Sequence, residues 1–346
     1  MGEILGVGCS HGPGVVGPLE RGSHYLRQHL EEEETPAELK DPKNWPLQMQ
    51  EEWGNDQGMT HAKKYQEILQ PAYRKARAEI DAFNPDFVLI FGDDQYECLL
   101  EDLLLPFNIF AVPEVEGPVR GADSGGGSAR ILGHQDAANY LARELINSGF
   151  DVGCSWKLPH RQMYGHAFTT TIHYLDLDHR GWPYRLIPVA VNCYGDDLRV
   201  PTPEYPNPSG IGRRLENVKM PPPPGPAPFR CYDFGRRVGE ILKASPYRAV
   251  IIGSSSWSHA SLTTKNHYMW PDVESDRQRF AELKNGEGYK WRDLTSDQLK
   301  DAGQHEFRNW ICFAGAMHGR GKPDYVAWAE AYTNNSCKAV VIYNAE

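Results

Sequence analysis

Short apolar runs alternate along the chain with longer segments in which apolar residues recur every three or four positions. The short runs predict buried strands, and the longer segments predict amphipathic helices. The predicted strands cover residues 3–9, 87–91, 107–112, 185–191, 248–252 and 339–343, and the predicted helices cover residues 61–83, 134–147, 274–283, 304–317 and 324–331. This alternation predicts an α/β fold with a central sheet, mostly parallel or mixed, layered by helices.

The chain of 346 residues shows no internal repeat and no shift in composition that would divide it. We therefore expect one large catalytic domain over residues 1–346. Two surface inserts are predicted. The first, at about 15–58, is polar and contains four consecutive glutamates, and the second, at about 195–228, is rich in proline.

Composition excludes several classes of protein. A net charge of −10 without a basic stripe argues against nucleic-acid binding. No apolar run approaches the ~18 residues of a membrane-spanning helix, and the first residues lack the pattern of a secretory signal. Seven cysteines without a Cys-x-x-Cys pair fit a reducing compartment and give no thiolate zinc motif. We expect a cytoplasmic protein in which any metal is held by nitrogen and oxygen atoms.

The predicted helix at 304–317 carries a carboxylate beside its buried face. Gly303 opens it, and Phe307 and Trp310 begin the apolar stripe next to Glu306. A carboxylate directed toward a core should be paired, protonated or bound to a metal, because an unpaired buried charge is costly. The alternative interpretation is that Glu306 or His305 caps the first helical turn.

Other polar residues gather where the predicted strands end. His11 follows the first strand, Gln95 follows the strand at 87–91, and His259 follows the strand at 248–252. In open α/β folds the ligand crevice lies outside the carboxyl ends of the strands, so these side chains can converge on one site. His166 begins a further helix after a glycine.

The order of these motifs resembles the class III extradiol ring-cleavage dioxygenases. This superfamily includes the protocatechuate 4,5-dioxygenase catalytic subunit and the 2,3-dihydroxyphenylpropionate dioxygenase. The motifs are Gly-Cys-Ser-His11-Gly-Pro, Ile-Phe-Gly-Asp-Asp-Gln95-Tyr, Gly-His166-Ala-Phe, Gly-Ser-Ser-Ser-Trp-Ser-His259 and His-Glu306-Phe-Arg-Asn-Trp310. The resemblance covers nearly the whole chain, and the motifs around His11, His259 and Glu306 are its most specific parts.

The resemblance implies a ferrous ion held by two histidines and one glutamate, a geometry typical of non-heme iron oxygenases. By motif, His11 matches the first ligand and Glu306 matches the carboxylate. His166 matches an acid/base histidine, and His259 matches a histidine that contacts the substrate hydroxyl or the oxygen. The family usually has Asp-His-Gly where this chain has Gly165, His166 and Ala167, so a carboxylate that orients His166 is missing from the motif.

The second histidine ligand of the family is replaced by Gln95. Gln95 could itself be a weak ligand, or His61 could fill the vacancy from the helix at 61–83. A third interpretation is an altered metal site used for another purpose. Asp93 and Asp94 also offer oxygen donors close in sequence.

The resemblance implies an iron-dependent oxidoreductase of aromatic catabolism. Such an enzyme opens the ring of a catecholic compound and incorporates both atoms of O2. Family members are often oligomeric, so we expect a homo-oligomer, and the need for a small partner subunit stays open. The alternatives are a metal-dependent hydrolase or lyase on the same fold, and a metal-free binding protein.

Overall fold

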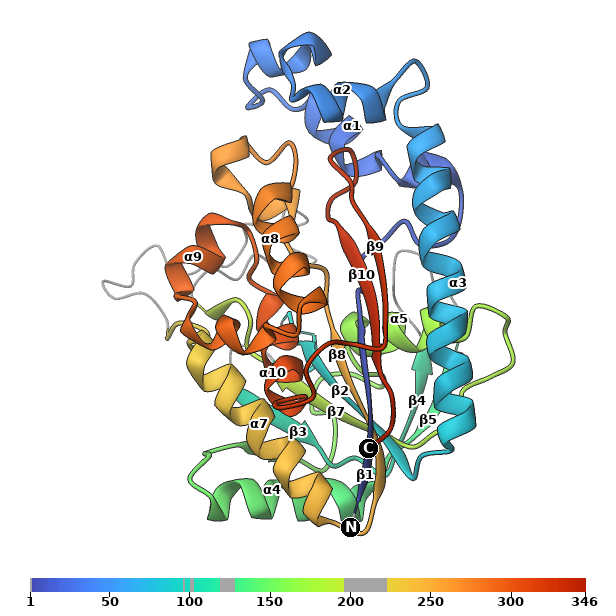
Figure 1. The fold of residues 1–346 in the computed structure, drawn as a ribbon, viewed down its shortest axis with the longest axis vertical. Coiled ribbons are helices and arrows are strands. Elements are labelled where there is room, and N and C mark those ends of the chain that lie inside the picture. The colour runs from blue at the N-terminus through green and yellow to red at the C-terminus, as the bar shows by residue number, and fades with distance from the viewer. Residues whose placement is uncertain (1, 96, 100–102, 119–127, 196–222) are drawn as a thin grey trace.

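The computed structural model describes residues 2–95, 97–99, 103–118, 128–195 and 223–346. A central sheet contains β1 (Glu3–Cys9), β2 (Phe87–Asp93), β3 (Phe107–Phe110), β6 (Gly153–Ser155), β7 (Leu186–Val191), β8 (Arg248–Ser254), β9 (Tyr325–Ala329) and β10 (Lys338–Tyr343). These strands follow the order β6-β3-β7-β2-β8-β1-β10-β9 (Figure 1). A separate antiparallel pair is formed by β4 (Glu114–Pro118) and β5 (Ser128–Leu132).

The central sheet is mixed. Strands β7, β2, β8 and β1 are mutually parallel, whereas β3 runs antiparallel to β7, and β10 runs antiparallel to both β1 and β9. The carboxyl ends of the four parallel strands therefore lie at one edge of the sheet. Each apolar run predicted as a strand forms one, which confirms the predicted α/β class.

The helices are α1 (His24–Glu31), α2 (Leu47–Trp53), α3 (Met59–Phe83), α4 (Gln135–Asn147), α5 (His166–Leu175), α7 (Pro228–Ala244), α8 (Val273–Lys284), α9 (Ser296–Asp301) and α10 (Phe307–Ala316). Short 3-10 helices span Leu19–Arg21, Ala37–Lys40, Pro42–Asn44, Ala260–Leu262, Thr264–Asn266 and Gly288–Asp293. Among the described residues, no helix combines the length and the apolar character needed to cross a bilayer.

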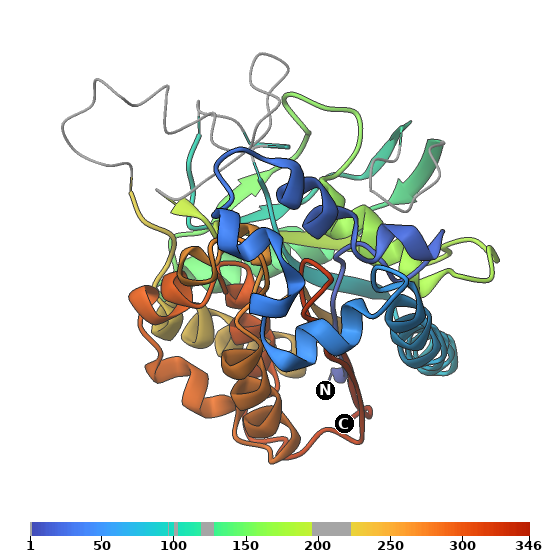
Figure 2. The ribbon, with the colours of Figure 1, turned by 90° about the horizontal axis from the view of Figure 1, so that it is seen from above.

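Helices cover both faces of the sheet. Phe87, Leu89 and Phe91 of β2 pack with α4, α7 and α10, whereas Val88 and Ile90 pack on the opposite face with α3 and α5. Figure 2 shows α3 and the C-terminal helices on opposite sides. A strand buried on both faces reads as a continuous apolar run, which is why this strand is clear from sequence.

Helix α10 packs closely against the sheet where two glycines face it. A Cβ atom at Gly8 would lie 2.3 Å from a ring carbon of Trp310, and one at Gly253 would lie 2.4 Å from Cβ of Phe313. Because the two glycines have no side chains, α10 can pack directly on β1 and β8. This packing brings Glu306, at the N-terminal end of α10, to the edge where the parallel strands end.

The prediction of a helix over 324–331 is wrong, because residues 325–329 form β9. Tyr325 and Ala327 pack with one side of the core, and Val326 and Trp328 pack with the other. This period of two suits a strand that pairs with β10. Pairing with a neighbour distant in sequence thus overrides the local helical pattern.

The first of the two predicted inserts lies entirely within the described residues. Residues 15–58 contribute no strand and form short helices, with α1 and α2 at the end of the molecule toward which the parallel strands run (Figure 1). Most of the predicted insert at 195–228 lies outside the described residues. Helix α7, which the sequence pattern did not predict, begins at Pro228, a residue suited to the first turn of a helix.

Candidate active site

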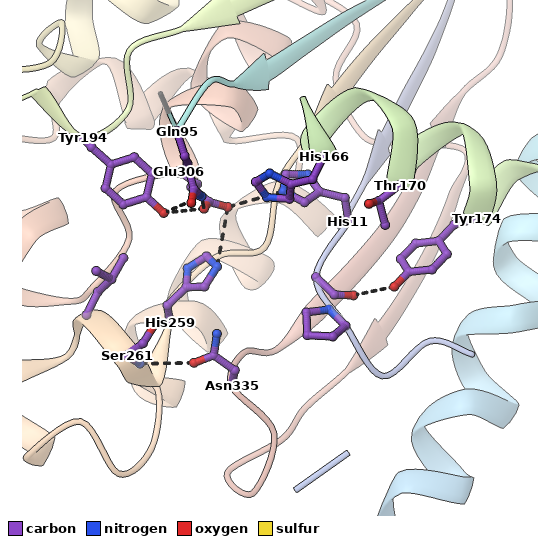
Figure 3. Close-up of a pocket in the computed structure, with 13 residues that line it drawn as sticks. His11, Gln95, His166, Thr170, Tyr174, Tyr194, His259, Ser261, Glu306 and Asn335 are labelled. Atoms are coloured by element: carbon purple, nitrogen blue, oxygen red, sulfur yellow. Dashed lines mark hydrogen bonds and ion pairs between the residues drawn. The ribbon is translucent and has the colours of Figure 1, made fainter. Parts of the chain in front are cut away.

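Five predicted site residues line one pocket at the carboxyl ends of the parallel strands (Figure 3). They are His11, Gln95, His166, His259 and Glu306. Three follow the ends of β1, β2 and β8, one begins α5, and one stands at the start of α10. The remaining lining residues are Gly12, Pro13, Thr170, Tyr174, Tyr194, Ser261, Leu262 and Asn335.

The prediction of His61 as a metal ligand needs correction, because the structure places this residue in a different pocket. That pocket also contains Glu52 and Glu330. The Nε2 atom of His61 lies 3.0 Å from the carbonyl oxygen of Glu330 and 3.6 Å from Oε1 of Glu52. The first turn of α3 therefore directs His61 toward α2 and the end of β9, and His61 does not fill the vacancy left by Gln95.

A chain of hydrogen bonds determines which nitrogen of His11 carries the proton. Thr171 donates its hydroxyl to the carbonyl of Ala167 at 2.6 Å, so the short contact between Thr171 and Ser254 must use the hydroxyl hydrogen of Ser254. The Ser254 oxygen is then the acceptor for Nδ1 of His11, at 3.0 Å. The Nε2 atom consequently presents a lone pair to the pocket, the orientation expected of a metal ligand held by a second group. Burial lowers the pKa of His11 well below its usual value, which keeps the ring neutral.

His259 presents its Nε2 lone pair to the same point. Its Nδ1 lies 3.1 Å from the carbonyl oxygen of Trp257, and a carbonyl can only accept, so Nδ1 carries the proton. Burial, assisted by the charge of Lys338, lowers the pKa of His259 to about 3. His259 is therefore neutral in the pocket.

Glu306 is 2% exposed, and its two oxygens have different surroundings. Oε1 accepts hydrogen bonds from Nε2 of Gln95 at 2.8 Å and from the hydroxyl of Tyr194. Oε2 has no hydrogen-bond partner among the described residues and lies 3.7 Å from Nε2 of His11 and 3.5 Å from Nε2 of His259. Burial raises the pKa of Glu306 to about 8. A buried oxygen that faces two lone pairs requires a proton or a cation, so the residues present fit a metal ion.

A second buried carboxylate adjoins this cluster. Asp93, the last residue of β2, is fully buried, and its Oδ1 lies 3.7 Å from Nε2 of His11. Its Oδ2 accepts a hydrogen bond from Nε2 of Gln95 at 3.0 Å. Burial raises the pKa of Asp93. One potential ligand atom from each of His11, Asp93 and His166 lies within 4.8 Å of the others.

His166 has an orienting carboxylate after all, but a residue other than the one in the family motif supplies it. Oε2 of Glu97 lies 2.8 Å from Nδ1 of His166 and accepts its backbone N–H at 2.8 Å. Arg161 donates to the other oxygen of Glu97 at 2.9 Å. Burial would lower the pKa of His166, but Glu97 outweighs it and raises this pKa to about 10.

Two partners of the site, Glu97 and Tyr194, were not predicted from the sequence. Tyr194 follows the end of β7, so the rule of strand ends that singled out His11 could also have found it. Glu97 carried no such signal, because its role depends on a contact with a residue 69 positions away.

Comparisons with known proteins agree with the motifs. No family model matches the chain. A 2,3-dihydroxyphenylpropionate/2,3-dihydroxicinnamic acid 1,2-dioxygenase 2 of Pseudomonas putida is 27% identical over 188 residues, 54% of this chain and 47% of that protein. Proteins named 2,3-dihydroxyphenylpropionate/2,3-dihydroxicinnamic acid 1,2-dioxygenase from Comamonas testosteroni and Rhodococcus jostii (strain RHA1) are each 26% identical, over 68% and 72% of this chain and 61% and 82% of theirs.

These relatives support the class III extradiol superfamily that the motifs indicate. The chain spans about half the length of the first curated relatives that it matches. A crystal structure of uncharacterized protein JW3007 from Escherichia coli K12 has a TM-score of 0.46 and 10% identity, covering 79% of this chain and 91% of that one. This last similarity is too low to inform the function.

Proposed function

We propose that this protein is a metal-dependent extradiol dioxygenase, an oxidoreductase that opens the ring of a catecholic compound beside its hydroxyl groups and inserts both atoms of O2. The observation that carries the proposal is the convergence of lone pairs in the pocket. The Oε2 atom of Glu306 has no hydrogen-bond partner among the described residues, and it faces Nε2 of His11 at 3.7 Å and Nε2 of His259 at 3.5 Å. Such an arrangement is unfavourable unless a proton or a cation occupies it, and a metal ion bound by His11 and Glu306 would satisfy it.

In this proposal His11 and Glu306 hold ferrous iron. At such a site the ion supplies one-electron chemistry between a catechol and O2. The surrounding side chains orient these two ligands. Tyr194 and Gln95 hold one oxygen of Glu306 and leave the other for the metal. Thr171 and Ser254 keep His11 in the tautomer that binds.

In this proposal His166 and His259 transfer protons to and from the substrate. His166, oriented by Glu97, lies beside His11 with the two ring centroids 5.1 Å apart, so it can exchange a proton with a catechol hydroxyl bound at the same point. His259 also lies beside Glu306, and the lone pair on its Nε2 can accept a proton or a hydrogen bond from the substrate hydroxyl (Figure 3). The identity of the ion as Fe(II) and a homo-oligomeric state are parts of the same proposal that rest on the family resemblance. A cytoplasmic location and a single catalytic domain are further parts that rest on the composition of the chain.

The experiment is turnover of protein purified without oxygen and loaded with Fe(II). The first probe is 2,3-dihydroxyphenylpropionate, the compound in the names of the relatives, followed by catechols with other substituents. The expected result is consumption of one O2 per ring opened, with both atoms of labelled O2 in the product. Ring opening that continues at the same rate under strict anaerobiosis would contradict the proposal.

The replacement of the family's histidine by Gln95 favours a second candidate, a hydrolase or lyase that uses a divalent ion on this fold. The same anaerobic comparison separates the two, because a hydrolase or lyase does not consume O2.

A further inference from the structure

We infer that Asp93, and not Gln95, is the third ligand of the metal centre. In this inference Gln95 orients the carboxylates of Asp93 and Glu306 by hydrogen bonds, so that both point at the metal. This inference rests on the proposed metal site and specifies its donor set. It makes the centre a site of one imidazole and two carboxylates. Neither the family motif nor the relatives' names assign such a site to this chain.

The two carboxylates divide their oxygens in the same way. Asp93 and Glu306 each give one oxygen to Nε2 of Gln95, at 3.0 and 2.8 Å. The other oxygen of each lies 3.7 Å from Nε2 of His11. This oxygen of Asp93 also accepts a long hydrogen bond from Nδ2 of Asn309 at 3.4 Å, whereas that of Glu306 has no hydrogen-bond partner among the described residues. A single amide thus holds both outer oxygens, and both inner oxygens face the same lone pair.

The orientation of the Gln95 amide follows from its partners. Only its nitrogen can donate, so the nitrogen must face Asp93 and Glu306, and an amide nitrogen is not a metal ligand. Turning the amide to offer its oxygen would place that oxygen against two carboxylates. Such acceptor–acceptor contacts in a buried site are costly. Gln95 therefore cannot both donate to the two carboxylates and bind the metal through its amide oxygen.

The distances around His11 also fit a shared ion. Two oxygen or nitrogen ligands about 2.1 Å from one ion lie about 3 to 4.2 Å apart in octahedral geometry. The separations of 3.7 Å from Nε2 of His11 to Oδ1 of Asp93 and to Oε2 of Glu306 fall within this interval. The unpartnered Oε2 of Glu306, a residue that is 2% exposed, is an independent sign of a ligand position next to His11.

The donor set has a chemical consequence. Replacing an imidazole by a carboxylate makes the site harder and adds negative charge, which favours oxygen-seeking ions such as Mn(II) over ions that prefer nitrogen. We therefore expect Fe(II) and Mn(II) to bind with more similar affinity than at a centre of two histidines and one carboxylate.

The test measures metal binding without turnover. Metal-depleted protein is titrated anaerobically with Fe(II) and with Mn(II) by calorimetry, and bound metal is counted by elemental analysis. Asp93→Asn keeps the shape of the side chain and should weaken binding by about 100-fold or more. Gln95→Leu should still bind one ion, weakened by about tenfold, in the range seen when an outer partner of a ligand is removed.

Asp94→Asn is the matched control. The two oxygens of Asp94 accept the backbone N–H groups of Cys98 and Leu99, each at 2.8 Å, so this neighbouring carboxylate holds a turn and not the ion. Its replacement should leave metal affinity within about twofold if circular dichroism shows an intact fold.

The outcomes separate this inference from the proposed function. If the wild type binds one ion and loses it in His11→Ala and Glu306→Gln but not in Asp93→Asn, Asp93 is not a ligand and the metal centre stands. Loss of the ion in Gln95→Leu with retention in Asp93→Asn would make Gln95 the ligand and overturn the inference. A wild type that binds no metal would overturn both proposals.

Discussion

A Cβ atom at Gly165 would lie 2.5 Å from Oε2 of Glu97, so glycine at this position leaves the space that the carboxylate occupies. The same carboxylate holds both the backbone N–H and Nδ1 of His166. The related family usually carries an aspartate immediately before its histidine. In this chain the carboxylate instead comes from Glu97, in the segment after β2. Gly165 leaves room for it because glycine has no side chain.

This relationship predicts that Glu97 is a positioning residue for His166. In Glu97→Gln the charge that orients His166 is lost, and we expect kcat to fall about 10- to 100-fold, the usual effect of removing the partner of a site histidine. Metal content and KM should change little. Steady-state kinetics with elemental analysis would check this.

Glu114→Gln is the control, because Glu114 makes an equally direct pair with Arg130 at 2.7 Å on the surface. A Glu97→Gln enzyme with the kcat of the control would show that Glu97 does not act through His166.

Gly165→Ala should reproduce much of that loss by displacing the carboxylate. The clash is with the end of a flexible side chain, so the fold should survive while Glu97 moves away from His166. Because the two substitutions break one interaction, their effects on kcat should not add in the double variant. Additive losses in this double-mutant cycle would contradict the steric relationship.

His166→Phe tests the proton-transfer role directly. We expect the variant to keep its metal and to lose ring opening by about 10²- to 10⁴-fold, the usual contribution of a general acid or base. Single-turnover kinetics on protein of measured metal content would distinguish loss of chemistry from loss of metal. Normal turnover would show that His166 is not the acid or base.

Gly8→Ala should disturb the site from a distance by lifting α10 from the sheet. The added methyl group would meet the ring of Trp310, and overpacking of this kind costs about 1–3 kcal/mol. We also expect weaker metal binding, because Glu306 stands at the N-terminal end of the same helix. Urea denaturation and metal titration would measure the two effects.

Lys63→Ala, at a side chain that is 69% exposed on α3, serves as the reference for Gly8→Ala. Its free energy of unfolding should change by less than about 0.5 kcal/mol. A Gly8→Ala protein as stable as this reference would show that β1 and α10 can separate enough to admit a methyl group without cost.

The sequence by itself determined the class of fold and the five titratable or amide side chains around which the pocket forms. Apolar runs identified the buried strands, and polar residues at their ends identified His11, Gln95 and His259, because the carboxyl ends of parallel strands meet at one edge. Glu306 was predictable as a carboxylate beside the apolar face of a helix. These features are local, since they depend on residues a few positions apart.

The tertiary structure decided what each of these residues contacts. It turned residues 325–329 into a strand by pairing them with β10, and it placed His61 in another pocket. It brought Glu97 to His166 across 69 positions and Gln95 to Glu306 across 211. No local pattern encodes such contacts, because they form only when the sheet brings its strand ends together. For this reason the contacts around His11 follow from the fold and not from the motif.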